Sequence, residues 1–429
     1  MKNTVATFIV SQQINIKQQI LNWCNQFSIC CFFDNNNFQD NYNSYECVAA
    51  ITSNTIFAKD IVDIGFDELQ QIIINKKKWL FGHIGYDFKN ELFQLESNHQ
   101  NTINFPNAFL FEPEIVVTLI DDKLTVESEI VDCNEVYKNI LNCNNVDENV
   151  VQNKFNIQPK ISKEKYIETI KQLQHHIHIG DCYEINFCQE FFAENATINP
   201  LYTFNKLNKI SPTPFAAFYK LNNNYLLCAS PERFVKKVEN KIISQPIKGT
   251  AKRNLLNAEL DKQLINELKN SQKETSENVM IVDLVRNDLS KICNAATVEV
   301  EELMEVYSFK QVHQMISTIV GNLKPNINFA NVLQALFPMG SMTGAPKYKV
   351  MQLIEQYEQT KRNIYSGCVG YISPENDFDF NVVIRSIMYN AQEKYVSYEV
   401  GGAITHYSNA EQEYEECLLK AIAVSEALK

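Results

Sequence analysis

An acid and an amine lie in two short motifs near the middle of the chain. Glu232 belongs to Ser-Pro-Glu-Arg-Phe, and Lys248 belongs to Pro-Ile-Lys-Gly-Thr. The residues between them, 234–238 and 242–245, predict two strands joined by a turn around Asn240. Positions that are symmetric about such a turn face each other with Cβ atoms roughly 5 Å apart. The spacing therefore predicts that the carboxyl group and the amine meet, either as a catalytic pair or as an ordinary cross-strand salt bridge.

Four further carboxylates occur in two pairs at helical spacing. They are Glu274 and Glu277 in the predicted helical run 259–289, and Glu413 and Glu416 in the predicted helix 411–428. Each pair continues an apolar stripe at spacings of three and four, which turns it toward the interior. Like charges one turn apart repel each other unless a cation lies near them. Two solvated helix faces would explain the pairs, and so would one site for Mg²⁺, which prefers oxygen ligands.

Candidates for anion binding follow in the C-terminal half. Thr343, Gly344 and Lys347 lie in a turn that leads into a predicted helix, and free amides at a helix start suit an anion. The lysine is not spaced from its glycine as in a nucleotide phosphate loop. Arg385, in the predicted strand 380–387, suits bidentate carboxylate binding, with an ordinary surface ion pair as the alternative.

The composition excludes several classes of partner. The 429 residues are 45% hydrophobic and 11% aromatic, which is enough for a large buried core. A formal net charge of −12 argues against nucleic acid and anionic membrane surfaces as partners. The twelve cysteines show no C-x-x-C pair or zinc-ligand spacing, and Met1–Lys17 resembles neither a secretory leader nor a membrane span. We therefore expect a cytoplasmic protein with reduced thiols.

The elements that position these groups fall into two regions. The polar, asparagine-rich segment 142–159 predicts a linker, which divides the chain into residues 1–155 and 156–429. A helix is predicted from Ser162 to Gly180. The three histidines near its end do not share one helical face, which disfavours a metal site there.

Two more strand predictions bear on the candidate site. Residues 182–188 alternate, which predicts a strand with Glu184 and Asn186 on its polar face. Residues 380–387 and 395–400 are predicted to pair with each other.

The ordered motifs of residues 162–429 resemble the chorismate-utilising enzymes, and among them the aminodeoxychorismate synthase component I family. The matching motifs are Gly180–Tyr183, Ser230–Phe234, Pro246–Thr250, Met280–Asp288, Thr343–Lys347, Tyr365–Gly367 and Glu413–Lys420. The N-terminal region resembles the family more weakly, mainly through Gly85–Asp87. The resemblance implies an α+β fold like that of anthranilate synthase component I. Antiparallel β-sheets would pack face to face with helices outside, and both regions would form one globule.

The resemblance also implies the roles of individual residues. Mg²⁺ would be held, partly through water, by Glu274, Glu277, Glu413 and Glu416. Chorismate would be bound by Thr343, Gly344, Lys347, Tyr365, Arg385, Gly401, Gly402 and Lys420. The catalytic residues would be Lys248 and Glu232.

Lys248 discriminates between members of the family. Anthranilate and isochorismate synthases usually resemble Pro-Ile-Ala-Gly-Thr at this motif, so the lysine implies amination of chorismate at C4 to 4-amino-4-deoxychorismate, in p-aminobenzoate and folate biosynthesis. The amine would add at C2 as the C4 hydroxyl leaves with a proton from Glu232, and ammonia at C4 would then expel the lysine. Such an amine must be neutral, so we expect burial beside Mg²⁺ to lower the pKa of Lys248. The acid must keep a proton near neutral pH, which predicts a raised pKa for Glu232.

Two positions depart from the family pattern. Glu184 stands where the synthases usually carry glutamine, and Gln314 stands where histidine is usual, although His313 precedes it. Isochorismate-forming relatives carry a water-activating lysine at the position of Glu184, so its absence disfavours addition of water at C2.

The resemblance leaves a partner and two alternatives. The chain has no Gly-x-Cys-x-Gly nucleophile turn, so we expect a separate glutamine amidotransferase subunit to supply ammonia. An anthranilate synthase component I would aminate C2 and eliminate pyruvate. A catalytically silent chorismate-binding protein should have lost some of Glu232, Lys248 and the four paired carboxylates.

Overall fold

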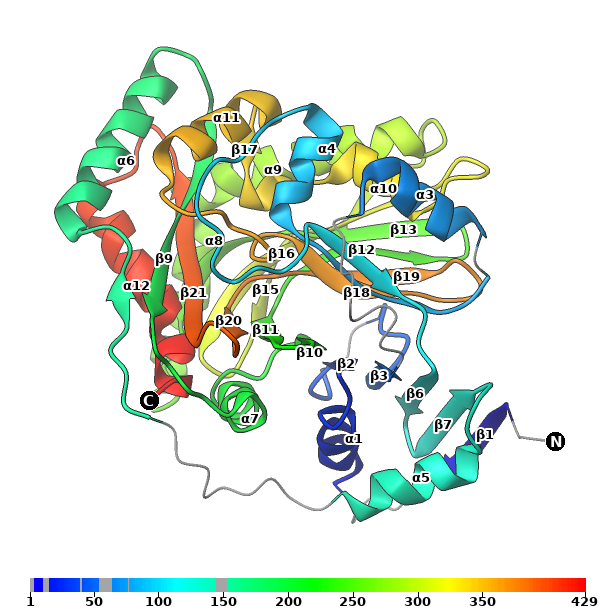
Figure 1. The fold of residues 1–429 in the computed structure, drawn as a ribbon. Coiled ribbons are helices and arrows are strands. Elements are labelled where there is room, and N and C mark those ends of the chain that lie inside the picture. The colour runs from blue at the N-terminus through cyan, green and yellow to red at the C-terminus, as the bar shows by residue number, and fades with distance from the viewer. Residues whose placement is uncertain (1–3, 11–14, 39–40, 54–63, 76, 144–152) are drawn as a thin grey trace.

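The computed structural model describes residues 4–10, 15–38, 41–53, 64–75, 77–143 and 153–429. Two antiparallel sheets form the frame of the molecule (Figure 1). The larger sheet contains, in order across it, β1 (Val5–Ile9), β7 (Lys123–Ser128), β6 (Ile115–Ile120), β3 (Cys47–Thr52), β2 (Ile29–Asp34), β10 (Phe215–Leu221), β11 (Asn224–Ser230), β20 (Ser386–Asn390), β21 (Tyr395–Ile404), β9 (Glu184–Ala193) and β17 (Gly344–Ala345), with β8 (Gln158–Pro159) beside β9.

The smaller sheet also mixes strands from distant parts of the chain. It contains β14 (Ile247–Lys252), β16 (Val312–Asn322), β13 (Lys241–Gln245), β12 (Arg233–Val238), β19 (Phe378–Val382), β18 (Cys368–Ile372), β4 (Leu80–Ile84) and β5 (Ala108–Phe111), with β15 (Glu299–Ser308) beside β16. Strands from before residue 155 therefore pair with later strands in both sheets. The division at residue 155 stays a prediction about the sequence.

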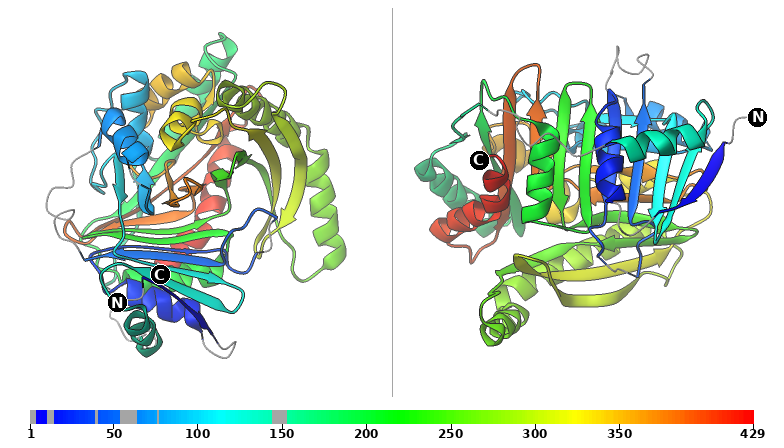
Figure 2. Two further views of the ribbon diagram at one scale, coloured as in Figure 1. Left: turned by 90° about the vertical axis from the view of Figure 1, so that its right-hand side faces the viewer. Right: turned by 90° about the horizontal axis from the view of Figure 1, so that it is seen from below.

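The helices cover the sheets from outside. They are α1 (Ile16–Cys24), α3 (Phe66–Asn75), α4 (Lys89–Phe93), α5 (Cys133–Asn142), α6 (Lys163–His178), α7 (Pro200–Ile210), α8 (Ala258–Asn270), α9 (Gln272–Ile292), α10 (Phe329–Leu336), α11 (Lys347–Tyr357) and α12 (Ala410–Ala427), with 3-10 turns η1 (Tyr86–Phe88) and η2 (Gly340–Met342). Figure 2 shows α1, α5, α7 and α12 side by side over one face of the larger sheet. Among the described residues, no helix combines the length and apolar character that crossing a membrane requires.

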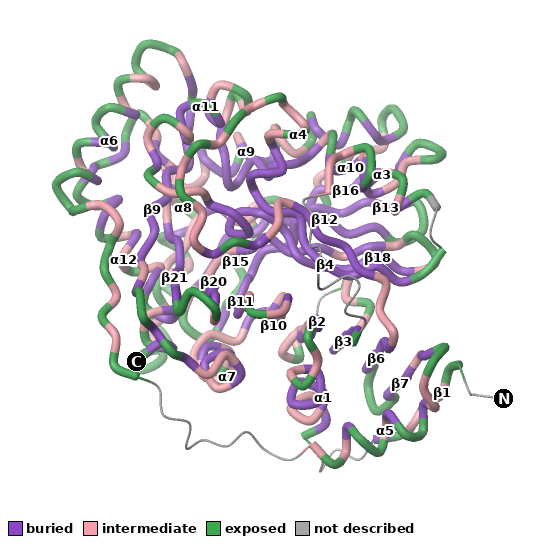
Figure 3. The backbone as a smooth tube through the Cα atoms, viewed as in Figure 1, coloured by how far each residue is buried: buried purple, intermediate pink, exposed green. Residues whose placement is uncertain are grey.

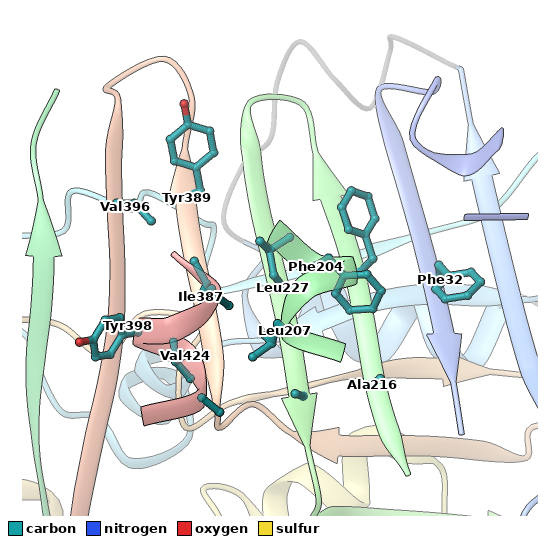
Figure 4. Packing of buried hydrophobic residues seen from close by; sticks show 14 of the residues in the cluster. Phe32, Phe204, Leu207, Ala216, Leu227, Ile387, Tyr389, Val396, Tyr398 and Val424 are labelled. Atoms are coloured by element: carbon teal, nitrogen blue, oxygen red, sulfur yellow. The ribbon is translucent and has the colours of Figure 1, made fainter. Parts of the chain in front are cut away.

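Alternation along the strands fills two cores. On β2, Cys30 and Phe32 enter the core under α1 and α7, whereas Ile29 and Cys31 enter the core between the sheets. Phe32 packs edge to face against Phe204 of α7 with ring centroids 6.4 Å apart (Figure 4). The strands in the middle of the molecule are accordingly buried on both faces (Figure 3). The predicted α+β fold of face-to-face antiparallel sheets with outer helices is confirmed.

Several local predictions can be compared with the structure directly. The helix predicted from Ser162 is α6, and the Ser162 hydroxyl caps it by accepting from the Lys165 amide. The predicted helical run 259–289 is two helices, because Ser271 ends α8 and caps the start of α9. His176 near the end of α6 contacts Asp181 and Tyr357 over 2.6 and 2.9 Å.

The predicted linker 142–159 is only partly described. Residues 144–152 lie outside the described residues, and α5 extends to Asn142. Gln158 and Pro159 form β8, which pairs with β9.

Two neighbouring strands pass from one sheet to the other at the same place. Pro231 and Glu232 join β11 of the larger sheet to β12 of the smaller one, and residues 383–385 join β19 to β20. The single strand predicted over 380–387 is therefore wrong, although β20 does pair with β21 as predicted. Arg385 lies in the connection with φ of 53°, in the left-handed region.

A buried arginine connects the end of α11 to η2 and to β9. Arg362 is 1% exposed, and its guanidinium donates to both carboxylate oxygens of Glu358 over 2.9 and 2.6 Å. It also donates to the carbonyls of Met342 (2.7 Å) and Asn186 (2.9 Å). The ion pair therefore fixes η2 and β9 relative to α11.

Replacing this arginine should destabilise the protein strongly. Arg362→Met would leave the buried Glu358 carboxylate without its cation, which costs about 3–5 kcal/mol. Urea denaturation followed by circular dichroism measures the free energy of unfolding. Arg286→Met is the control, because that side chain is half exposed and pairs with Asp283 on the surface, so about 0.5 kcal/mol or less is expected. An equal decrease in the free energy of unfolding in the two variants would contradict the structural role of Arg362.

Candidate active site

A cavity at the junction of the two sheets gathers most of the predicted site residues. Its lining comes from β14, β16, α9, η2, β21 and α12, and from the two connections that cross between the sheets. The predicted residues that line it are Glu232, Lys248, Glu274, Glu277, Tyr365, Arg385, Gly401, Gly402, Glu416 and Lys420.

Four predicted residues lie outside this lining. Glu413 lies just behind it, since a Cβ on Gly402 would stand 3.3 Å from Glu413 Oε2. The Thr343 amide donates to the Gly340 carbonyl, and Gly344 pairs with Ile185 in the sheet.

Lys347 has a structural set of partners. Its ammonium donates to Asp288 Oδ2 and to the Leu336 carbonyl, both over 2.9 Å. The polar groups of the anion-binding site predicted at Thr343, Gly344 and Lys347 are therefore engaged in contacts within the protein. A role of these three residues in substrate binding stays a prediction.

Other residues that line the cavity were not singled out by sequence analysis. Among them are Lys273, Ser341 and Glu399. The sequence could have identified Lys273, because it precedes Glu274 and lies four residues before Glu277 on the same helix face. No sequence pattern identifies Ser341, because only the fold brings it next to Glu232.

Glu232 is buried beside one hydroxyl. Ser341 Oγ donates to Glu232 Oε1 over 2.6 Å, and the backbone amide of Val382 donates to the Glu232 carbonyl over 3.0 Å. Burial raises the pKa of Glu232 to about 7, although the Ser341 hydroxyl and Lys248 act in the opposite direction. The predicted raised pKa is confirmed, and such a group both holds and releases a proton near neutral pH.

Glu232 and Lys248 do not face each other across the hairpin. The last pair between β12 and β13 is Arg233 with Gln245, after a bulge, and β14 then pairs with β16. The predicted cross-strand contact is therefore wrong, because the strand changes its neighbour at Pro246. The two side chains still line one cavity.

The amine of Lys248 instead pairs with a carboxylate from the other sheet. Lys248 Nζ donates to Glu184 Oε1 over 2.7 Å, and the two side chains are 9% and 1% exposed. Burial lowers the pKa of Lys248, but Glu184 and Glu277 outweigh this effect, so the pKa lies above the ordinary lysine value. The lowered pKa that we expect for Lys248 beside bound Mg²⁺ therefore stays a prediction, and it did not include the Glu184 partner.

Three of the four glutamates predicted to hold Mg²⁺ lie around a lysine ammonium. Lys273 Nζ lies 2.9 Å from Glu413, 3.9 Å from Glu416 and 4.0 Å from Glu277. Burial lowers the pKa of Lys273, but Glu413 and Glu416 outweigh this effect and raise it. Among the described residues, no three acidic, histidine or cysteine side chains converge closely enough to enclose a metal ion as they stand. The carboxylates do require a cation, and the ammonium of Lys273 supplies one.

The surroundings of Glu277 indicate whether a metal ion would suit these four carboxylates. Its Oε1 atom is buried, has no hydrogen-bond partner among the described residues, and lies 4.0 Å from the Lys273 ammonium. Burial raises its pKa to about 8, and repulsion from Glu184 and Glu274 adds to this effect. An unpartnered buried oxygen among like charges fits a hard divalent cation, which takes oxygen ligands and relieves the repulsion. The donor set is therefore suited to Mg²⁺ in charge and chemistry.

Two cationic side chains also line the cavity, next to these carboxylates. Lys420 Nζ lies 2.8 Å from Glu416 Oε1 and 3.0 Å from the Gly401 carbonyl, and Lys420 lowers the pKa of Glu416 to about 2. Arg385 donates to the Lys420 carbonyl over 2.9 Å through one nitrogen. A lysine and an arginine beside the metal candidate would suit the carboxylates of a small dianion.

The two departures from the family pattern have different surroundings. Gln314 lines the cavity, and its buried Oε1 atom has no hydrogen-bond partner. His313 lies outside that lining and contacts Asp261 (3.0 Å) and Ser308 (2.8 Å). His313 therefore does not replace the usual histidine in this site.

The fold and this cavity place the chain in a known class of proteins. A family model described as chorismate binding enzyme matches residues 30–426, and the chain belongs to that family. It is 34% identical over 395 residues to the chloroplastic aminodeoxychorismate synthase of Arabidopsis thaliana, covering 86% of this chain and 42% of that protein. It is 38% identical over 259 residues to aminodeoxychorismate synthase component 1 of Salmonella typhimurium, covering 60% of this chain and 56% of that protein.

Solved structures agree on the fold. Anthranilate synthase component I from Streptococcus pneumoniae matches with a TM-score of 0.75 and 23% identity, covering 100% of this chain and 93% of that chain. This likeness establishes the fold alone. The chain spans about half the length of the two synthases, 42% and 56%.

Removing the hydroxyl beside Glu232 should raise the pKa of that carboxyl further. Ser341→Ala deletes a donor that stabilises the charged form, so the pKa should rise above the value of about 7. Infrared difference spectroscopy of the carboxyl band against pH measures this shift. Ser244→Ala is the control, since Ser244 donates to the Phe234 carbonyl on the same hairpin. An unchanged or lowered pKa in Ser341→Ala would contradict the assignment.

Proposed function

We propose that this chain is an aminodeoxychorismate synthase component that aminates chorismate at C4 to 4-amino-4-deoxychorismate, in p-aminobenzoate and folate biosynthesis. The observation that carries the proposal is one cavity that contains both an amine, Lys248, and an acid with a pKa of about 7, Glu232. The names of the relatives at 34% and 38% identity support the choice of reaction.

The proposed reaction uses Lys248 as a nucleophile and Glu232 as an acid. The Lys248 nitrogen forms a bond to C2 of chorismate while the ring double bonds shift and the C4 hydroxyl leaves. Glu232 gives its proton to that hydroxyl, which departs as water. Ammonia then bonds to C4, the double bonds shift back, and the bond between C2 and Lys248 breaks. Glu232 regains its proton from the new amine.

We propose that Glu274, Glu277, Glu413 and Glu416 hold Mg²⁺, in part through water. The bound ion supplies positive charge that neutralises a substrate carboxylate. The unpartnered oxygen of Glu277 supports this assignment. Lys273 would have to leave these carboxylates when the ion binds, because its ammonium lies within 4.0 Å of three of them.

The remaining lining residues suit the anionic groups of the substrate. Arg385 and Lys420 provide positive charge, and Gly402 leaves room beside Glu413 and Lys420 for a substrate group. Tyr365 adds a buried phenol. Thr343, Gly344 and Lys347 would contribute only if substrate rearranges their present hydrogen bonds.

Ammonia would come from a separate glutamine amidotransferase subunit. The name of the Salmonella relative, component 1, supports a second component. We also place the reaction in the cytoplasm, which is supported by twelve cysteines that are all free thiols.

The first test is turnover by the intact chain. With chorismate, Mg²⁺ and ammonium at mildly alkaline pH, we expect 4-amino-4-deoxychorismate by mass spectrometry. Lys248→Ala and Glu232→Gln should each lower this turnover by about 100-fold or more, because each removes a group that bonds or protonates the reacting atoms. Lys237→Ala is the control, since Lys237 is bound to Asp377 away from the cavity. Anthranilate with pyruvate, or binding without turnover, would overturn the proposed reaction.

The second test concerns the metal ion. Glu277→Gln removes one charged oxygen ligand, so we expect at least about tenfold more Mg²⁺ to be needed for half-maximal activity. The rise in melting temperature caused by Mg²⁺ should weaken in the same variant. Glu415→Gln is the control, because Glu415 pairs with Lys163 on the exposed face of α12. Equal Mg²⁺ dependence in both variants would exclude Glu277 as a ligand.

A further inference from the structure

Glu184 is a buried carboxylate that the proposed reaction has not used. It is the first residue of β9, between β21 and β17 in the larger sheet. We propose that Glu184 is the proton acceptor for Lys248, taking the ammonium proton through their 2.7 Å contact so that the amine attacks as a neutral nucleophile. This inference rests on the proposed function.

The geometry makes Glu184 the immediate partner of the reacting nitrogen. Its Oε1 atom accepts directly from Lys248 Nζ, and its buried Oε2 atom has no hydrogen-bond partner in the described part of the chain. Lys248 lines the cavity, whereas Glu184 lies outside the lining and is 1% exposed. The carboxylate therefore meets the reacting atoms through the amine alone, from the side away from the substrate.

The other nearby carboxylates have different partners or roles. Glu232 accepts from Ser341 and is the proposed acid, which cannot also take the Lys248 proton before it gives its own. Glu277 belongs to the proposed metal ligands. Glu184 thus accepts a hydrogen bond from the amine and has no competing role in the reaction.

The proposed transfer conserves atoms and charge within the site. The proton moves from Lys248 Nζ to Glu184, which turns a buried ion pair into two neutral groups and frees the nitrogen electron pair for C2. When ammonia later breaks the bond to Lys248, the amine leaves neutral and recovers the proton from Glu184.

Glutamine at this position could not perform the transfer. A glutamine oxygen would still accept a hydrogen bond from Lys248, but an amide does not take up a proton at neutral pH. The change from glutamine to glutamate thus supplies this chain with its own base behind the nucleophile. It also places the base out of contact with the cavity, where it cannot activate a water molecule for attack on C2.

The covalent step can be measured without ammonia. The intact chain is mixed with chorismate and Mg²⁺, and mass spectrometry follows the adduct at Lys248 with time. Glu184→Gln keeps the size and the hydrogen bond but loses the acceptor, so we expect adduct formation about 100-fold slower. Glu190→Gln is the matched control, because it changes a buried carboxylate on the same strand that binds the Tyr395 hydroxyl. That variant should react at the unaltered rate.

A chemical rescue separates proton transfer from packing. Glu184→Ala leaves space behind Lys248, and added formate should restore adduct formation by at least tenfold, whereas formamide of the same size should not. If this variant fails to fold, as circular dichroism would show, the isosteric Glu184→Gln carries the test alone. Adduct formation as fast in Glu184→Gln as in the unaltered chain, or equal rescue by formate and formamide, would overturn the role of Glu184.

The outcomes distinguish this inference from the proposed function. If the unaltered chain makes 4-amino-4-deoxychorismate with ammonium and the Glu184 variants match it, only the role of Glu184 is wrong. If the unaltered chain forms neither the product nor a Lys248 adduct, both proposals fail.

Discussion

The balance of buried charge at the junction of the two sheets is the constraint on which the site depends. Carboxylates from α9, α12 and β9 lie against ammonium groups from α9, α12 and β14, and most of these side chains are shielded from water. Each ion is tolerable only because another of opposite sign lies within about 4 Å. The contacts therefore determine which groups hold protons, and a change at one member alters the others.

The sheets reach this arrangement by exchanging strands. β11 continues into β12 and β19 into β20, so two adjacent strands leave one sheet and enter the other together. The connections between these strands contain Glu232 and Arg385, which belong to neither sheet. Arg385 adopts a left-handed backbone conformation there, which non-glycine residues rarely do and which the surrounding sheets impose. The crossing thus places an acid and a guanidinium cation in the lining of one cavity.

Sequence reasoning identified what periodicity and family motifs encode. The pairs Glu274 with Glu277 and Glu413 with Glu416 were recognisable because i, i+3 spacing on an apolar stripe fixes their direction, and the antiparallel α+β fold followed from the family motifs. It missed contacts between residues far apart in the chain. Lys248 and Glu184 are 64 residues apart, and Ser341 and Glu232 are 109 apart. The hairpin register also failed, because a bulge and a change of neighbouring strand interrupt the local pattern.

The interleaving of the two sheets also determines when the chain can acquire its structure. β2 pairs with β10, β4 pairs with β18, and β21, which ends at Ile404, lies between β20 and β9. Neither half of the sequence can therefore complete a sheet before the other half is present. During synthesis, apolar strands from the first half therefore stay without some of their partner strands until the second half has been translated. Such non-local pairing slows folding and exposes unpaired strand edges to aggregation, so this chain should depend on chaperones more than a chain of independent domains would.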